Sequence, residues 1–317
     1  MNPAAQSPSI AVVLPAYNEE ATLEATMRAF HRALPAAAIW VINNRSSDGT
    51  ETVARATLAA LGCAGGVLNE SRQGKGNAVR RAFIEIDADI YLMSDADLTY
   101  PAERAPDLIA PILDGRADMV VGDRHSAGHY AAENKRPLHG VGNRLVQLLV
   151  NKLFRADLAD IMSGYRAFSR RFVKGYPIIV EGFEVETDVT LHALDKRFRI
   201  VEIPVEYRDR PAGSVSKLST YRDGAKVLFV ILQIFRYYRP LLFFGLLSLA
   251  MLLFALAASV PVFDDWFRYQ FIFHVPLAVL AASSVIVSVV LLAVGLMLDS
   301  IAHQQKMNYE LTILGKR

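Results

Sequence analysis

Short apolar runs alternate with helical patterns through the first 125 residues of the chain. The apolar runs predict strands over 10–16, 38–43, 66–70, 90–97 and 117–124. The stretches between them predict helices over 18–34, 50–61, 75–87 and 102–114. Strands that alternate with helices across short connections are typical of a mostly parallel sheet covered by helices.

The pattern changes after residue 125. Longer helices are predicted over 137–154 and 184–196, and a late strand over 199–208. The chain shows no internal repeat and no low-complexity tract. We therefore expect one large α/β domain over residues 1–215.

Two stretches near the C-terminus contain no charged residue. Residues 241–260 form a run of 20 and residues 275–298 a run of 24. Each run is long enough to cross about 30 Å of hydrocarbon at about 1.5 Å per residue. Two such runs in tandem predict an integral membrane protein with two transmembrane helices in a region over 240–317, rather than two buried helices of a soluble domain.

The flanks of these runs predict their orientation. Basic residues precede the first run and follow the second: Lys217, Arg222, Lys226, Arg236, Arg239, Lys306, Lys316 and Arg317. The connection between the runs carries one arginine, two aspartates and several aromatic residues. The positive-inside rule then places both termini, and the large domain, in the cytosol. Residues 216–239 mix basic and apolar side chains, which predicts helices lying in the membrane interface or an amphipathic helix packed on the domain.

Overall composition narrows the function only slightly. The 317 residues include 34 Lys and Arg against 32 Asp and Glu, a net charge of +2. This balance gives no indication of nucleic-acid binding. The single cysteine, Cys63, cannot form an internal disulfide and is best read as a small buried residue. The first nine residues lack the pattern of a secretory signal, so we expect none.

The segment "SDADLTYP" (94–101) follows an apolar strand and contains Asp95 and Asp97. Paired carboxylates at the carboxyl end of a strand suit Mg²⁺ or Mn²⁺ that bridges a diphosphate. Two aspartates in a surface turn are common, so this pair alone is a weak indication. Other strand ends strengthen it.

Polar residues follow the first two strands as well. "LPAYNEE" offers Pro15, Tyr17 and Glu19, and "NNRSSDGT" offers Asn43 and Asn44. The two amides could read a ligand or only cap a turn.

Lys75, between two glycines, opens a helix whose N-terminal amides favour anions. The spacing of a Walker loop is absent. The sequence thus predicts a ligand site at one edge of the sheet.

Several motifs together resemble a known family. "VVLPAYNEE", "SSDGT", "RQGKGNAVRRA", "SDADLTYP" and "VVGDR" resemble the family 2 glycosyltransferases, whose fold is the nucleotide-sugar-binding GT-A domain. "DIMSGYRAFSRR", "EGFEVETDVTLHALDK", "EIPVEYRDRPAGSVSKL" and the two apolar runs resemble the bacterial polyprenyl-phosphate glycosyltransferases, relatives of dolichyl-phosphate mannose synthase. The resemblance covers nearly the whole chain.

The resemblance implies roles for the strand-end residues. The nucleotide-sugar donor would be held by Pro15, Tyr17, Glu19, Lys75, Asp95, Ala96 and one residue of the pair Asn43 and Asn44. Asp95 and Asp97 would serve the diphosphate and a Mg²⁺ or Mn²⁺ ion, with Asp97 favoured as the direct ligand. Relatives often carry Gln where this chain has Thr99, whose hydroxyl would be a further metal ligand. Relatives usually carry aspartates where Asn43 and Asn44 stand.

Basic residues would serve the acceptor. The resemblance implies that Arg124 contacts the acceptor phosphate and that Arg210 and Lys217 clamp phosphates next to the membrane. A lipid phosphate stays at the bilayer surface, so its cationic partners must lie on the membrane side of the domain. Glu186 and Asp188 would receive sugar hydroxyls, or would only favour the start of a helix.

The implied reaction is the transfer of a sugar from a UDP-sugar to undecaprenyl phosphate or a similar lipid, with inversion at the anomeric carbon. The product would be a lipid-linked monosaccharide, made at the cytosolic face of a bacterial inner membrane by a dimer or tetramer. A processive polysaccharide synthase is the alternative enzyme, but neither Trp40 nor Trp266 belongs to the Q-x-x-R-W motif of such synthases. A non-catalytic membrane scaffold of the same fold is the third hypothesis.

Overall fold

The computed structural model describes residues 7–126, 137–182, 184–208 and 232–315 of the chain. The chain forms two compact units, Met1–Asp223 and Gly224–Arg317. The expected boundary of the α/β domain at residue 215 lies outside the described residues, and it remains a proposal.

The first unit contains a seven-stranded mixed sheet in the order β3-β2-β1-β4-β6-β5-β7. Its strands are β1 (Ile10–Ala16), β2 (Ala38–Asn43), β3 (Gly65–Asn69), β4 (Ile90–Met93), β5 (Met119–Asp123), β6 (Arg166–Ser169) and β7 (Ile200–Pro204). The neighbours β3, β2, β1 and β4 are parallel, as are β5 and β7. Strand β6 runs antiparallel to both β4 and β5, so β4 and β5 point the same way.

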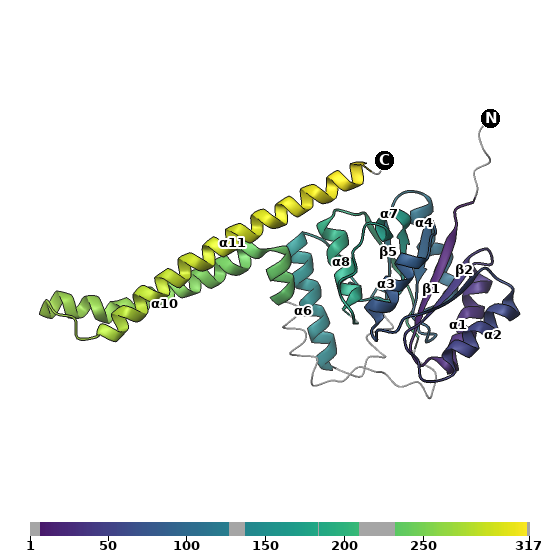
Figure 1. Cartoon of the computed structure of the whole chain (residues 1–317), viewed down its shortest axis with the longest axis horizontal. Coiled ribbons are helices and arrows are strands. Elements are labelled where there is room, and N and C mark those ends of the chain that lie inside the picture. Colours follow the sequence, from purple (N-terminus) through teal and green to yellow (C-terminus); the bar gives the residue numbers. More distant parts are fainter. Residues whose placement is uncertain (1–6, 127–136, 183, 209–231, 316–317) are drawn as a thin grey trace. The chain divides into compact units, whose positions relative to one another are not determined.

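Helices connect the strands and cover the sheet (Figure 1). Those of the first unit are α1 (Glu20–Ala33), α2 (Thr50–Leu61), α3 (Lys75–Glu85), α4 (Ala105–Leu113), α6 (Pro137–Phe154), α7 (Arg170–Val173) and α8 (Val185–Asp195), with a 3₁₀ turn η1 at Ala102–Arg104. Helix α2 ends at Gly62, whose left-handed backbone (φ 60°) closes the helix with a hydrogen bond to Leu58.

Alternate strand residues pack against helices on the two faces of the sheet. On one face, Leu14 of β1 and Leu92 of β4 join a buried cluster with residues of α1, α2 and α4. On the other face, the ring of Phe83 in α3 lies 5.8 Å from Tyr91 and 5.6 Å from Phe168. Because the strands are buried on both faces, they read as continuous apolar runs in the sequence.

The expected α/β sheet with flanking helices is confirmed, and one strand was missed. β6 has only four residues, "RAFS", and lies between two parts of the parallel sheet. A strand this short, beginning with a buried arginine, has no periodic pattern that identifies it. Its presence makes the sheet mixed and brings the segment before Arg166 to the carboxyl end of β4, because Arg166 pairs with Met93.

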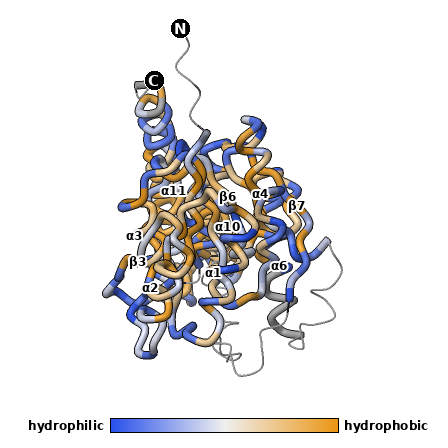
Figure 2. The backbone as a smooth tube through the Cα atoms, turned by 90° about the vertical axis from the view of Figure 1, so that its right-hand side faces the viewer, coloured by the Kyte–Doolittle hydropathy of each residue, from blue (hydrophilic) through white to orange (hydrophobic). Residues whose placement is uncertain are grey.

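The second unit contains α10 (Pro240–Tyr269) and α11 (Val275–Gly315), which lie side by side (Figure 1). Both are long and apolar enough to cross a membrane. At about 1.5 Å per residue, α10 is about 45 Å long and α11 about 60 Å, so both helices continue beyond the expected spans of 241–260 and 275–298. Figure 2 shows α11 turning from hydrophobic to more hydrophilic towards the C-terminus.

Serine side chains join the two helices. Ser288 Oγ of α11 donates to the carbonyl oxygen of Ser248 in α10 at 2.9 Å, and the two hydroxyl oxygens are 3.0 Å apart. Small polar residues of this kind let helices approach closely in lipid. Of the segment expected to lie in the interface, 216–231 is outside the described residues, while 232–238 is helical.

Candidate active site at the carboxyl edge of the sheet

The strands β1, β2, β4 and β5 end at the same edge of the sheet. Three residues other than glycine have left-handed backbone angles in the loops that follow: Asn18 (φ 54°), Arg45 (φ 61°) and Leu98 (φ 63°). Such angles are unfavourable for bulky residues and concentrate at functional sites. The loops after β1, β2 and β4 therefore each contain such a residue, as do three places away from this edge, at Arg155, Arg197 and Gln270.

Asp97 and Thr99 lie together in the loop after β4. With Leu98 in the left-handed region, Asp97 Oδ1 accepts hydrogen bonds from Thr99 N at 3.2 Å and from Thr99 Oγ1 at 2.5 Å. Both residues are buried. Asp95 is more open, with 29% of its side chain exposed.

Lys75 lies between two carboxylates. Its ammonium pairs with Asp95 Oδ1 and lies 2.5 Å from Glu186 Oε1. The side chains of Lys75 and Glu186 are buried, with 9% and 8% of their surface exposed. Burial alone disfavours the ammonium, but the charges of Asp95 and Glu186 outweigh it and raise the pKa of Lys75. The structure thus places Lys75 against protein carboxylates rather than leaving it directed at an anion.

The first turn of α3 is covered by a loop. The amide of Gly76 donates to the carbonyl oxygen of Gly182 at 3.1 Å, and the amide of Asn77 to that of Glu181 at 3.3 Å. A Cβ at Gly76 would lie 2.2 Å from the carbonyl oxygen of Val180, so only glycine permits this approach. The expectation that these amides face an anion is wrong for this structure, because backbone carbonyls already accept from two of them.

Asn43 and Asn44 are both buried and both bonded within the protein. Asn44 Nδ2 donates to the carbonyl oxygen of Arg72 at 2.7 Å, and its Oδ1 accepts from Gly74 N at 2.8 Å. Asn43 Nδ2 donates to Asn69 Oδ1 at 3.0 Å, and its Oδ1 accepts from the amide of Ser46 at 3.2 Å. Asn44 therefore uses both ends of its amide to hold the loop that leads into α3.

The remaining donor residues lie at the same edge. Pro15 pairs with Ile42 in the parallel register of β1 and β2, and Tyr17 and Glu19 follow as partly buried residues. Ala96, between the two aspartates, is buried, and its carbonyl oxygen accepts from the hydroxyls of Thr22 and Thr26 in α1. The fold thus brings these residues, predicted to bind the nucleotide-sugar donor, to one edge of the sheet.

Arg124, immediately after β5, is held by a residue that the sequence analysis did not single out. Its Nε donates to Asp160 Oδ2 at 2.6 Å and its Nη2 to Asp160 Oδ1 at 3.0 Å. Burial raises the pKa of a carboxyl group, but the Arg124 charge and hydrogen bond lower the pKa of Asp160. The motif "DIMSGYR" contains Asp160, but the sequence has no feature that pairs it with an arginine 36 residues earlier.

Glu186 and Asp188 point to different partners. While Glu186 pairs with Lys75, Asp188 Oδ2 accepts from the hydroxyl of Tyr176 at 2.6 Å. Burial raises the pKa of Asp188 despite this bond. Of the two acidic residues, Glu186 is the one that contacts Lys75, the partner of Asp95.

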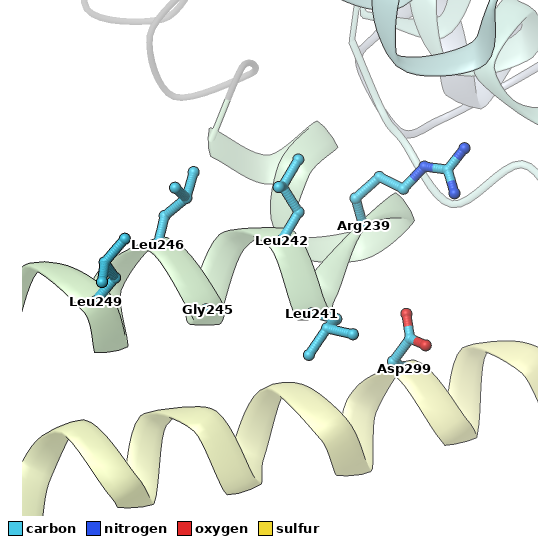
Figure 3. Close-up of a pocket in the computed structure, with 7 residues that line it drawn as sticks. All are labelled: Arg239, Leu241, Leu242, Gly245, Leu246, Leu249 and Asp299. Carbon is cyan, nitrogen blue, oxygen red and sulfur yellow. The ribbon is translucent and has the colours of Figure 1, made fainter.

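Arg210 and Lys217 lie outside the described residues. In the second unit, a groove of about 500 Å³ is lined by Arg239, Leu241, Leu242, Gly245, Leu246, Leu249 and Asp299 (Figure 3). The groove is mostly apolar. Its two charged residues are Arg239, immediately before α10, and Asp299 in α11.

The chemistry of the Asp95–Thr99 loop fits a divalent cation. Two carboxylates and a hydroxyl are hard oxygen donors of the kind that Mg²⁺ and Mn²⁺ prefer. No group of three His, Cys, Asp or Glu side chains suited to a metal occurs among the residues that the structure describes. An ion held by Asp95, Asp97 and Thr99 would therefore need further oxygens from water or a phosphate, as Mg²⁺ commonly does.

The chain is similar to known glycosyltransferases. The sequence pattern of glycosyl transferase family 2 matches residues 11–176. Glycosyltransferase AglJ of Haloferax volcanii is 30% identical over 302 residues, which cover 94% of this chain and 96% of that protein. A dolichyl-phosphate hexose transferase of the same organism is 30% identical, over 69% of this chain and 90% of its own length.

The fold is also shared with a solved structure. Glucosyl-3-phosphoglycerate synthase of Mycobacterium tuberculosis, crystallised with Mn²⁺, UDP-glucose and phosphoglyceric acid, superposes with a TM-score of 0.55 at 25% identity. The match covers 72% of this chain and 79% of that one. It confirms the expected GT-A fold. Together these similarities show that the chain belongs to glycosyl transferase family 2, among relatives that include a dolichyl-phosphate hexose transferase.

Proposed function

We propose that this glycosyltransferase transfers a hexose from a UDP-sugar to undecaprenyl phosphate or a similar polyprenyl phosphate. The observation that carries the proposal is the presence in one chain of a carboxylate pair at the carboxyl edge of a GT-A sheet and two helices long enough to span a membrane. An enzyme that joins a soluble donor to an acceptor confined to the bilayer needs a site for the donor and an attachment to the membrane. The relative that acts on dolichyl phosphate and the solved neighbour with UDP-glucose support the two substrates.

The donor diphosphate would bind beside Asp95 and Asp97, with Mg²⁺ or Mn²⁺ held by Asp97, Asp95 and Thr99. When bound, the ion supplies positive charge to the leaving diphosphate. Lys75 supports this arrangement from the protein side, because it neutralises part of the charge of Asp95 and Glu186. Asp97 stays fixed through its bonds to Thr99.

Arg124 would bind the acceptor phosphate. Its pairing with Asp160 fixes the orientation of the guanidinium. A phosphate monoester has a second pKa of about 6, so its oxygen is already a nucleophile at neutral pH and needs no dedicated base. A single displacement by this oxygen inverts the anomeric carbon. Arg210 and Lys217, beyond the described residues, would complete the cationic side of the site.

The proposal extends to the location of the enzyme. The basic residues that flank the two apolar helices support a multi-pass protein of a bacterial inner membrane with the catalytic unit and both termini in the cytosol. The groove beside Arg239 would receive isoprene units of a polyprenyl lipid, because leucine side chains line it. A homo-oligomer is proposed from the resemblance alone.

The test is a screen of nucleotide sugars with undecaprenyl phosphate and Mg²⁺ or Mn²⁺, using membranes that contain the full chain. With a UDP-hexose as donor, the expected product is a lipid phosphate heavier by one hexosyl group. NMR should show an anomeric configuration opposite to that of the donor sugar. A ladder of products would show a processive synthase instead. Absence of any glycolipid with every donor would overturn the enzyme proposal and favour the scaffold.

A further inference from the structure

Arg166, the first residue of β6, is completely buried in the first unit, with 0% of its surface exposed. Its guanidinium makes no ion pair with the carboxylates that the structure describes, and its partners are neutral. Burial lowers the pKa of Arg166, while the more distant charges of Glu186 and Asp160 oppose that effect. Burying a guanidinium costs free energy unless its hydrogen bonds are satisfied. The fold must therefore supply acceptors for Arg166.

Two of its nitrogens hold the loop before β6. Nε donates to the carbonyl oxygen of Ser163 at 2.7 Å, and Nη2 donates to that of Ile161 at 2.8 Å. The same loop carries Asp160, which pairs with Arg124. It also carries Gly164, where an added Cβ would lie 2.8 Å from Asp95 Oδ2, so the loop backbone packs directly against the donor-side carboxylate.

A third nitrogen holds α8. Nη1 donates to Thr190 Oγ1 at 2.8 Å, and this hydroxyl donates in turn to the carbonyl oxygen of Glu186 at 2.9 Å. One helical turn before Thr190, the Glu186 side chain pairs with Lys75. Arg166 is therefore connected to Glu186 through one hydroxyl and to Asp160 through one loop.

We infer that Arg166 is a positioning residue that holds the loop 160–164 and α8 in fixed relation. It thereby aligns the acceptor-side pair of Arg124 and Asp160 with the donor-side cluster of Lys75, Asp95 and Glu186. A planar fork that reaches two carbonyls and a hydroxyl on two elements is a geometry that lysine, a single point of charge, cannot reproduce. The role in catalysis rests on the proposed function, while the structural part stands on the contacts alone.

The first test is Arg166→Lys, which keeps the charge and removes the fork. Hydrogen exchange followed by mass spectrometry should show amides of residues 158–165 and 185–191 exchanging about tenfold faster, with β1 and β2 unchanged. The kcat for hexosyl transfer from the UDP-hexose should fall about a hundredfold, with the KM for that donor within about threefold, because misplacement affects the reacting geometry more than binding. Arg170→Lys is the matched control, since this arginine is exposed and pairs with Asp87.

If Arg166→Lys does not fold, Thr190→Val is the second test, because it removes the hydroxyl that joins α8 to the guanidinium and, at 3.3 Å, to the carbonyl oxygen of Ile161 in the loop. Faster exchange confined to the same two segments supports the inference, and exchange equal to that of Arg170→Lys overturns it. An unchanged kcat in a folded Arg166→Lys enzyme overturns the catalytic part. Faster local exchange in a chain that makes no glycolipid with any donor would refute the proposed function and leave the positioning contacts established.

Discussion

The ammonium of Lys75 lies 2.5 Å from Glu186 Oε1 and so ties the first residue of α3 to the first turn of α8. Both side chains are almost fully buried, and Asp95 is the second partner of the ammonium. Removing one member of such a cluster leaves an uncompensated buried charge. We expect Lys75→Met to lower the free energy of unfolding of the first unit by about 3 kcal/mol, measured by urea denaturation in detergent.

The double variant Lys75→Met, Glu186→Gln distinguishes charge from packing. It removes one negative charge along with the positive one, so it should recover part of the lost stability. Arg116→Met is the control, because Arg116 forms an exposed pair with Asp114 and should change the stability by less than about 1 kcal/mol. Equal losses in Lys75→Met and the double variant would contradict the electrostatic explanation.

Asp97 is expected to hold the metal. Asp97→Asn preserves the shape of the side chain and removes its charge, so the turn with Thr99 should remain while the affinity for Mn²⁺ falls. Hexosyl transfer should drop by about a hundredfold or more. Calorimetric titration with Mn²⁺ in the presence of UDP measures the binding directly, and Asp114→Asn, at an exposed site, is the control. Undiminished transfer by Asp97→Asn would remove Asp97 from the metal site.

The two asparagines after β2 should behave differently. Asn44 bonds the loop before α3 with both ends of its amide, so Asn44→Ala should reduce the free energy of unfolding by about 1–3 kcal/mol. Asn43 is also bonded at both ends of its amide, to Asn69 and to the amide of Ser46, so Asn43→Ala should cost a similar free energy. Asn43 is in addition expected to read the base, so only Asn43→Ala should raise the KM for the UDP-sugar, about tenfold. If neither variant raises that KM, both amides only support the loops.

Sequence patterns predict where the candidate site lies because strand ends are local features. The parallel strands β1, β2 and β4 each appear as an apolar run that ends in polar residues, and their shared direction brings Tyr17, Asn44 and Asp95 to one edge. The resemblance to family 2 glycosyltransferases was carried by the same segments, and the fold and the family are confirmed. The roles of the individual residues remain predictions.

The partners of these residues could not be predicted, because each lies far away in the sequence. Lys75 meets Glu186 of a helix more than a hundred residues later, and Arg124 after β5 meets Asp160 in the loop before the unpredicted strand β6. Periodicity and spacing carry no information about such long-range pairs. The loop that covers the first turn of α3 is another example, since the carbonyl oxygen of Gly182 accepts from Gly76 N and that of Glu181 from Asn77 N.

The orientation of the membrane helices can be tested with the single cysteine. Cys63 follows α2 in the first unit and is partly exposed. A maleimide reagent that does not cross membranes should label it in inverted vesicles and not in intact spheroplasts. In a Cys63→Ala background, Gln270→Cys, between α10 and α11, should show the reverse pattern, because the positive-inside rule places that turn on the far side. Labelling of both positions from the same side would refute the two-span topology.

His192 makes the stability of the first unit depend on pH. It is 7% exposed and packs against the rings of Tyr176 and Phe198, at centroid distances of 4.9 and 6.0 Å. Burial, with a smaller contribution from Lys196 and against the opposing charge of Asp195, lowers the pKa of His192 to about 4. In the unfolded chain a histidine titrates near pH 6.5, so between about pH 6.5 and 4 the unfolded state binds more protons than the folded one.

The stabilisation is therefore complete above about pH 6.5 and is lost as the pH falls towards 4, amounting to about 3 kcal/mol at 1.36 kcal/mol per pKa unit. Burial also raises the pKa of other carboxyl groups in the first unit, among them Asp188 and Glu202, so the measurement is the difference between the parent chain and His192→Gln. In a Trp266→Phe background, Trp40 in β2 is the single tryptophan and reports the unfolding of the first unit in urea. The difference in free energy of unfolding between the two chains should shrink by about 3 kcal/mol from pH 7 to pH 4, and a constant difference would show that His192 keeps an ordinary pKa in the folded protein.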